Sequence, residues 1–339
     1  MKKRFLTLFT AAAALCCALV AAGCATPAQD AGPDADNGAP AAAASGEAAA
    51  AADALRIGSL KGPTSVGLAA MMEKDEGVFT VAASADEIAP KLLQGELDIV
   101  LVPANLAATL YQKTDGNIRV LDVNTLGVLY AVSAADVDSV ECLVGRTVYL
   151  TGQGTVPECT VRALLDAAGV ADQVDLQFRS EPAEVAALIA RDHEAVGILP
   201  QPFATSATMK DDALQQRIDL TQAWDEVTQG ERGNLITGVT IATAGTVAEK
   251  RDAINAFLER HARSAAIAQS DPEAIAEEVV ALGIIDDLKI AEAAIPHCNV
   301  VCLTGQEMKD ALSAYLAVLE QQDPASVGGT LPAEDFYLL

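Results

Sequence analysis

The segment EIAPKLLQGELDIVLVPANLA (residues 87–107) is repeated later in the chain as EVAALIARDHEAVGILPQPFA (residues 184–204). The two copies align without a gap at an offset of 97 residues (184 − 87), so that Pro103 matches Pro200. Each copy reads as a helix, a turn, an apolar strand, a proline and a second helix. The repeat therefore predicts two similar halves.

A second matched pair lies upstream of the repeat. RIGSLKGPT (residues 56–64) and TVYLTGQGT (residues 147–155) each read as a strand that runs into a Gly-containing loop ending on Thr. Strands that alternate with helices predict parallel α/β sheets. The continuous apolar runs DIVLV and AVGIL indicate strands that are covered on both faces. We therefore expect an α/β fold with two lobes, each built on a parallel-rich sheet.

The strand pattern also predicts where the chain passes between the lobes. TLGVLYAVS (125–133) leaves the first lobe, and NLITGVTIATA (234–244) leaves the second. From Thr246 onward the pattern is helical, and we assign these helices to the first lobe. Lobe 1 is thus predicted to comprise residues 55–133 and 236–339, and lobe 2 residues 134–235. The paired crossings predict a hinge.

Four loops at the carboxyl ends of the predicted strands should meet in one cleft, because ligands of open α/β sheets bind beyond these ends. The loops carry LKGPT, VPANLA, LTGQGT and LPQPFAT. Each delivers a helix N-terminus, whose unpaired N–H groups favour an anionic or acceptor-rich ligand. For a single loop, the proline is equally explained by its preference for the first position of a helix and the glycine by its preference for turns. Their recurrence at repeated positions favours a cleft.

The first 23 residues have the pattern of a secretory signal peptide, with a basic start and an apolar run that ends in AAGC. A single weak membrane span is the alternative. Small residues before Cys24 resemble the bacterial lipoprotein box, in which this cysteine is lipidated and holds the chain at the membrane surface. Residues 24–54 are acidic and rich in Ala, which predicts a disordered tether. The remaining residues are enough for two ordinary domains.

Composition excludes several function classes. A net charge of −25 over 339 residues would repel a phosphate backbone, so nucleic acid is not expected as a partner. Neither HExxH nor CxxC occurs, and only three histidines are present, so we expect no dedicated zinc site. Trp224 is predicted to be a packing anchor of the second lobe. Four cysteines remain in the mature chain, able to pair in three ways or to stay as buried thiols: Cys142, Cys159, Cys298 and Cys302.

From residue 55 to the end, the chain resembles the solute-binding lipoproteins of bacterial ABC importers. It is most similar to the nitrate, sulfonate and taurine type, which includes binders of thiamine-pyrimidine precursors. The resemblance is carried by LKGPT, GELDIVLVPANLAATLY, NTLGVLY, LPQPFAT, AIPHCNVV and SVGGTLPAEDFY. It implies a two-lobed periplasmic-binding-protein fold of the second type, with a separate permease and ATPase as partners. It also implies a lipid-anchored, extracytoplasmic location, and we expect a monomer. None of these segments is specific for a ligand.

The resemblance points to the same loops for ligand binding. Lys61, the only cation among them, is either a counter-charge for an anionic group or a solvated surface lysine. Glu158 would repel such an anion or pair with an amine. Thr64 and Thr155 can cap helices as well as contact a ligand, and we expect Thr155→Ala or Asn105→Ala to weaken binding. The predicted ligand-binding residues are Lys61, Pro63, Thr64, Asn105, Asn124, Gly154, Thr155, Glu158, Gln201 and Phe203.

We predict a receptor without enzymatic activity or cofactor, which captures a small polar, anionic solute by closing its lobes and passes it to the permease. One alternative is a sensory lipoprotein that presents the ligand to a membrane receptor. Another is an enzyme like the yeast pyrimidine synthases, although the chain lacks their cysteine-rich motif. His297 and Cys298 are adjacent, and adjacent side chains rarely face each other. A metal-delivery role is disfavoured because none of the four loops contains a histidine.

Overall fold

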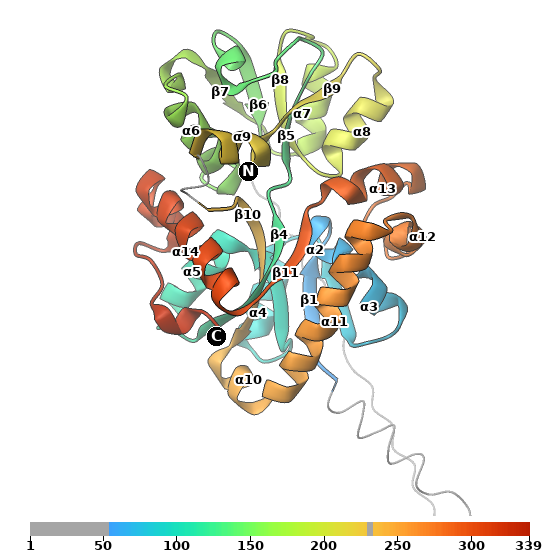
Figure 1. Ribbon diagram of the computed structural model, residues 1–339, viewed down its shortest axis with the longest axis vertical. Helices are drawn as coiled ribbons and strands as arrows, with labels where there is room; N and C mark the ends of the chain where they lie inside the picture. The colour runs from blue at the N-terminus through green and yellow to red at the C-terminus, as the bar shows by residue number, and fades with distance from the viewer. Residues whose placement is uncertain (1–53, 229–232) are drawn as a thin grey trace, which may run out of the picture. The chain divides into compact units, whose positions relative to one another are not determined.

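The computed structural model describes residues 54–228 and 233–339 (Figure 1). The predicted signal peptide, Cys24 and the predicted tether up to residue 53 lie outside these residues. Within the described part of the chain, no helix is both long and apolar enough to cross a membrane.

The described residues form an alternating series of strands and helices. The strands are β1 (Arg56–Leu60), β2 (Val78–Ala82), β3 (Ile99–Pro103), β4 (Ile118–Leu126), β5 (Leu129–Ser133), β6 (Thr147–Leu150), β7 (Asp175–Phe178), β8 (Val196–Pro200), β9 (Gln215–Asp219), β10 (Ile236–Thr243) and β11 (Val300–Leu303). The helices are α2 (Pro63–Val66), α3 (Ala69–Glu73), α4 (Ala85–Leu93), α5 (Ala104–Lys113), α6 (Val156–Ala167), α7 (Pro182–Ile189), α8 (Phe203–Lys210), α9 (Leu220–Thr228), α10 (Ala244–Glu249), α11 (Arg251–Ser270), α12 (Glu273–Ala281), α13 (Leu288–Ala294) and α14 (Gly305–Gln322). Short 3-10 helices are η1 (Val140–Leu143), η2 (Ala171–Gln173), η3 (Ile295–His297), η4 (Pro324–Val327) and η5 (Glu334–Phe336).

The strands form two sheets with corresponding strand orders, β11-β4-β10-β3-β1-β2 and β7-β6-β8-β5-β9 (Figure 1). β1 is parallel to β2 and β3, just as β6 is parallel to β7 and β8. An antiparallel strand then follows in each sheet: β10 places Gly238 opposite Pro103, and β5 places Leu129 opposite Pro200. The two-sheet α/β prediction is confirmed. Each sheet is parallel in the repeated half and antiparallel beyond it.

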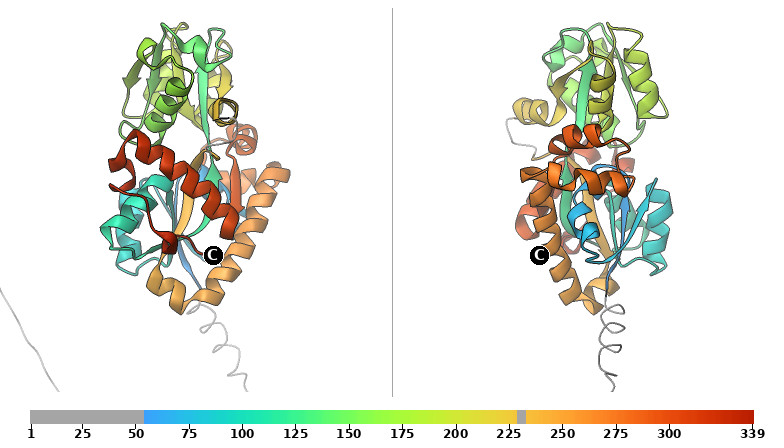
Figure 2. Two further views of the ribbon diagram at one scale, coloured as in Figure 1. Left: turned by 60° about the vertical axis from the view of Figure 1, so that its left-hand side comes forward. Right: turned by 90° about the vertical axis from the view of Figure 1, so that its right-hand side faces the viewer.

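Both faces of the first sheet are covered, as the apolar strands predicted. In β3, Val100 and Val102 face a core that includes α4, α5 and α14, whereas Ile99 and Leu101 face a core that includes α3, α11 and α12. This alternation follows from the two-residue period of a strand. Figure 2 shows α14 lying across one face of this sheet.

The first crossing between the sheets lies earlier than predicted. β5 pairs with β8 and β9, so residues 129–133 belong to the second sheet and not to lobe 1. The apolar run TLGVLYAVS contains the end of one strand and the whole of the next, because β4 ends at Leu126 and β5 begins at Leu129. Gly127 lies between them, where a Cβ atom would be 2.2 Å from Thr221 Oγ1. A larger residue at this position would force the Thr221 side chain to shift. The chain returns to the first sheet with β10.

The C-terminal part is largely helical, as predicted, with one strand that the pattern did not predict. β11 is a four-residue edge strand beside β4, too short to show a period. α11 packs on β11 and α14 packs on β4, but α13 also contacts α8 and α14 contacts α6. These helices therefore bridge to the second sheet as well as covering the first.

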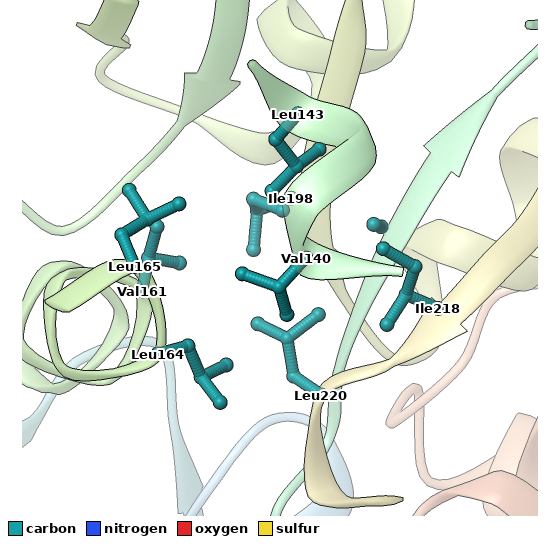
Figure 3. Close-up of a pocket in the computed structure, with 9 residues that line it drawn as sticks. Val140, Leu143, Val161, Leu164, Leu165, Ile198, Ile218 and Leu220 are labelled. Carbon is teal, nitrogen blue, oxygen red and sulfur yellow. The ribbon is translucent and has the colours of Figure 1, made fainter. Parts of the chain in front are cut away.

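The core between the second sheet and its helices is apolar and tightly packed. Figure 3 shows side chains of η1 and α6 converging on those of the sheet around an enclosed space of about 10 Å³. That volume holds about one water molecule at most, and an apolar lining gives a water no partners. The space is therefore core packing. It is lined by Ala131, Val140, Leu143, Val161, Leu164, Leu165, Ile198, Ile218 and Leu220.

Trp224 is a buried packing residue of α9. Its indole Nε1 donates to Gly233 O at 2.8 Å, and its ring lies edge-on to Tyr315, with the centroids 6.4 Å apart. Because Tyr315 belongs to α14, Trp224 joins the second sheet's helices to a helix that covers the first.

Candidate functional site

A cavity of about 760 Å³ lies between the two sheets. This volume is within the range of small-molecule sites. We call it the interlobe cavity, because the β1–α2 loop and the α12–α13 segment line it from the first sheet and the β8–α8 segment lines it from the second. Its lining residues are Leu60, Lys61, Gly62, Pro63, Thr64, Ala83, Pro103, Val128, Pro200, Gln201, Pro202, Phe203, Ser206, Lys210, Thr237, Ile284, Ile285, Asp286, Asp287 and Ile290.

The β1–α2 loop forms part of the first wall. Gly62 has a φ of 119°, a backbone conformation that favours glycine, and Pro63 then begins α2. Thr64 Oγ1 donates to Leu60 O at 2.9 Å, which holds the hydroxyl against the end of β1. Lys61 Nζ lies 3.2 Å from Asp286 Oδ1, so the loop's cation pairs with the α12–α13 segment.

The β8–α8 segment forms the second wall. Gln201 is buried, and its Oε1 accepts from Thr205 Oγ1 at 2.8 Å and from Thr205 N at 3.4 Å. Its Nε2 donates to Gln216 Oε1 at 3.2 Å. Gln201 therefore occupies the N-terminus of α8 itself. Phe203 is 39% exposed although it is a large apolar side chain, so an apolar surface is available here to a solute.

Five of the ten sequence-predicted ligand residues line the interlobe cavity, and these are Lys61, Pro63, Thr64, Gln201 and Phe203. The other five do not. Asn124 is buried in β4, where its Nδ2 donates to Thr240 Oγ1 at 3.1 Å. Asn105 lies in the first turn of α5, outside the lining although Pro103 belongs to it.

The β6–α6 loop contains three of the predicted residues, and its polar groups form hydrogen bonds within the loop and with the start of α6. Thr155 Oγ1 donates to Gly152 O at 2.7 Å, and Gly154 N donates to Glu158 Oε2 at 2.7 Å. Glu158 also pairs with Arg162 at 2.6 Å. Burial by itself would raise the pKa of Glu158, but the Gly154 N–H and the Arg162 guanidinium outweigh it and lower that pKa. The Glu158 charge is balanced within α6, so it does not project toward a solute as we expected.

Several lining residues were not predicted. Ser206 and Lys210 follow Phe203 at helical spacing, so a periodicity argument applied to α8 would have found them. Thr237 lies on β10, and residues 284–287 precede α13. No local pattern marks these, because they reach the cavity only through the way the C-terminal helices pack.

A buried polar cluster lies elsewhere, in the first sheet. His261 Nδ1 is 2.8 Å from Asp122 Oδ2, and the Cys302 thiol donates to the same oxygen at 3.5 Å. Their potential ligand atoms lie within 4.8 Å of one another, a donor set of the kind that binds zinc. Burial and the adjacent Asp122 carboxylate raise the pKa of the Cys302 thiol, which keeps it protonated. We interpret the cluster as hydrogen-bonded core structure.

The four cysteines of the described residues are free thiols. Cys159 and Cys298 are buried, and burial raises the pKa of Cys298 to about 12. Cys142 is exposed, and a hydrogen bond from Ser139 lowers its pKa. His297 is exposed beside the buried Cys298, so the two side chains do not form a reactive pair.

No protein-family model matches the sequence, and no curated protein matches it. Solved structures do match. An ABC transporter structure from Parabacteroides distasonis is 24% identical, covering 85% of this chain and 99% of that one, with a TM-score of 0.73. The periplasmic aliphatic sulphonate binding protein SsuA from Escherichia coli is 15% identical, covering 85% of this chain and 94% of that one, with a TM-score of 0.64.

The desulfurization enzyme DSZB also shares the architecture, at 11% identity over 83% of this chain and 95% of that one, with a TM-score of 0.56. At these identities the likeness shows the fold. The chain has the periplasmic-binding-protein fold that the resemblance in its sequence implied, and sulfonate-binding proteins are among the structures that share it.

Proposed function

We propose that this chain is an extracytoplasmic, lipid-anchored receptor that captures a small solute in the interlobe cavity and delivers it to an ABC permease and its ATPase. The observation that carries the proposal is the cavity of about 760 Å³, to which both sheets contribute residues. Proteins named as sulfonate-binding proteins or as the ligand-binding component of an ABC-type import system are among the matching folds. Lipidation of Cys24 would keep the receptor beside its permease.

Affinity in such a receptor arises from closure. A solute that contacts Pro63 on one wall and Phe203 on the other makes both sets of contacts only when the walls approach each other. It therefore shifts the population toward the closed state. The crossing between β4 and β5, at residues 126–129, is a segment around which this movement would occur.

Two further roles are compatible with the fold. A desulfurization enzyme shares it. Among the described residues the cavity lining has no Cys or His side chain, but Ser206 and Asp287 belong to classes that can act as nucleophile or base. We favour capture without chemistry because binding proteins share the fold. A sensory lipoprotein would use the same cavity and differ only in the partner that receives the closed form.

The test begins with the purified full-length chain. Mass spectrometry of the material released on denaturation identifies the bound solute, and calorimetry then measures its affinity. We expect Phe203→Ala to weaken binding by at least about tenfold, because the side chain offers apolar surface to the solute. Thr155→Ala, which the sequence alone predicts to weaken binding, affects a residue outside the cavity lining; it is the control and should bind as the parent does.

Uptake of the identified solute by cells then separates transport from sensing. Transport requires that uptake is lost when the receptor is deleted and is restored by the parent chain but not by Phe203→Ala. Binding in vitro with unchanged uptake in the deletion strain would favour the sensory role. Equal affinities for Phe203→Ala and Thr155→Ala would contradict the assignment of the cavity.

A further inference from the structure

We infer that the interlobe cavity takes a zwitterionic solute with an apolar body, such as a small apolar amino acid, and that a simple anion binds less well. This inference rests on the proposed solute-binding role. It is carried by three arrangements in and around the cavity: the internal pairing of the groups that suit an anion, the apolar walls, and charges of opposite sign on opposing walls.

Two groups that suit a lone anion, Lys61 and one N–H at the start of α8, already have partners within the protein. Lys61 pairs with Asp286 at 3.2 Å. In the first turn of α8, Gln201 Oε1 accepts from Thr205 N and Thr205 Oγ1. A simple anion would have to displace these contacts, and displacing a partner costs part of what the new contact contributes.

The walls between these groups are apolar. Pro63 and Pro103 line the cavity from the first sheet, and Pro200, Pro202 and Phe203 line it from the second. Three isoleucines of the α12–α13 segment continue the first wall. An apolar body of the solute would lose water on both sides when it enters, which is favourable in proportion to the apolar area buried.

Charges of opposite sign lie on opposing walls. Lys210, in the last turn of α8, makes no ion pair with any residue that the structure describes. Opposite it in the lining are Asp286, whose side chain is 87% exposed, and Asp287, which caps α13 through Ile290 N at 3.0 Å. Lys61 pairs with Asp286 on the first wall, so Lys61, Asp286 and Asp287 together give that wall a net charge of −1. An ammonium group would be attracted to this wall and a carboxylate to Lys210. A solute with both groups thus links the two walls, whereas an acid alone also faces the two aspartates.

The experiment compares two matched ligand sets by calorimetry on the full-length chain. One set is phenylalanine, 3-phenylpropionate and phenethylamine, and the other is leucine, 4-methylpentanoate and 3-methylbutylamine. We expect at least one amino acid to bind about tenfold or more tightly than both its acid-only and amine-only analogues. Lys210→Met should remove the advantage over the amine, and Asp286→Asn the advantage over the acid. Lys113→Met and Asp172→Asn, exposed residues outside the cavity, are the controls.

The inference is overturned if an acid-only ligand or an aliphatic sulfonate binds as tightly as the amino acids, although the receptor role would then stand. It is also overturned if neither amino acid binds, or if the two cavity variants behave like their controls. In those cases two separate experiments test the receptor role: identification of the solute released from the purified chain, and measurement of its receptor-dependent uptake.

Discussion

Asp98, at the start of β3, provides a quantitative test of how the first sheet is held together. Its side chain is 5% exposed, and its carboxylate accepts from Arg56 Nη2 at 2.7 Å, from Arg56 N at 2.9 Å and from Lys250 Nζ at 3.1 Å. These bonds join β1, β3 and α11 at the end of the sheet away from the interlobe cavity. Asp98→Asn should therefore change stability without changing solute binding.

The magnitude follows from the pKa of this carboxyl. Burial by itself would raise it, but the hydrogen bonds from Arg56 and Lys250 outweigh burial and hold the pKa of Asp98 at about 2, against an ordinary value of 3.8. A shift of one pKa unit corresponds to about 1.4 kcal/mol, so the ionised side chain contributes about 2 kcal/mol to the free energy of unfolding at pH 7. For a chain of this size, that loss should lower Tm by roughly 3–4 °C.

The sign of the pH dependence is fixed by the direction of the shift. The pKa of Asp98 is lower in the folded protein than in the unfolded chain. The stabilisation is therefore complete at pH values above the pKa of the unfolded chain, and it is lost as the pH falls through the pKa of the folded protein. Urea unfolding of the parent and of Asp98→Asn should thus differ by about 2 kcal/mol at pH 7 and by much less near pH 2. The exposed control Asp172→Asn should match the parent throughout. A difference that stays constant from pH 7 to pH 2, or no difference at pH 7, would refute the reasoning.

Two further predictions concern the second sheet. Leu164→Ala enlarges the apolar space between α6 and the sheet and should lower the free energy of unfolding by roughly 3 kcal/mol, with solute affinity unchanged; urea denaturation and calorimetry measure the two quantities. In the native protein, a thiol reagent should modify Cys142 in preference to the other three described cysteines, because it is exposed and its pKa is lowered. Mass spectrometry after brief labelling checks this, and modification of Cys298 before unfolding would contradict it.

Half of the residues predicted to bind the ligand line the cavity. The loops after β1 and β8 contribute to the lining, whereas the loop after β6 does not. Pro63 and Phe203 begin helices immediately after strands of the repeat, so the position of each follows from local order along the chain. Thr155 matches Thr64 in the upstream pair of segments, but the hydrogen bonds from Thr155 to Gly152 and from Gly154 to Glu158 stabilise its loop, which lies outside the cavity lining. A repeat predicts equivalent elements, but it does not predict that equivalent loops meet the same cavity.

The sequence by itself determined the two-sheet α/β architecture, because the repeated alternation of strand and helix is a local property that hydrophobic period and turn residues report directly. It did not determine the first crossing at Gly127, since one apolar run covers two strands. Nor did it determine the contribution of Asp286 and Ile290 to the cavity, or the pairing of Lys61. Those depend on α12 and α13 packing beside loops more than 200 residues earlier in the chain, as with Lys61 and Asp286 (225 residues apart). Such contacts are decided by side-chain packing in three dimensions, which no local period encodes.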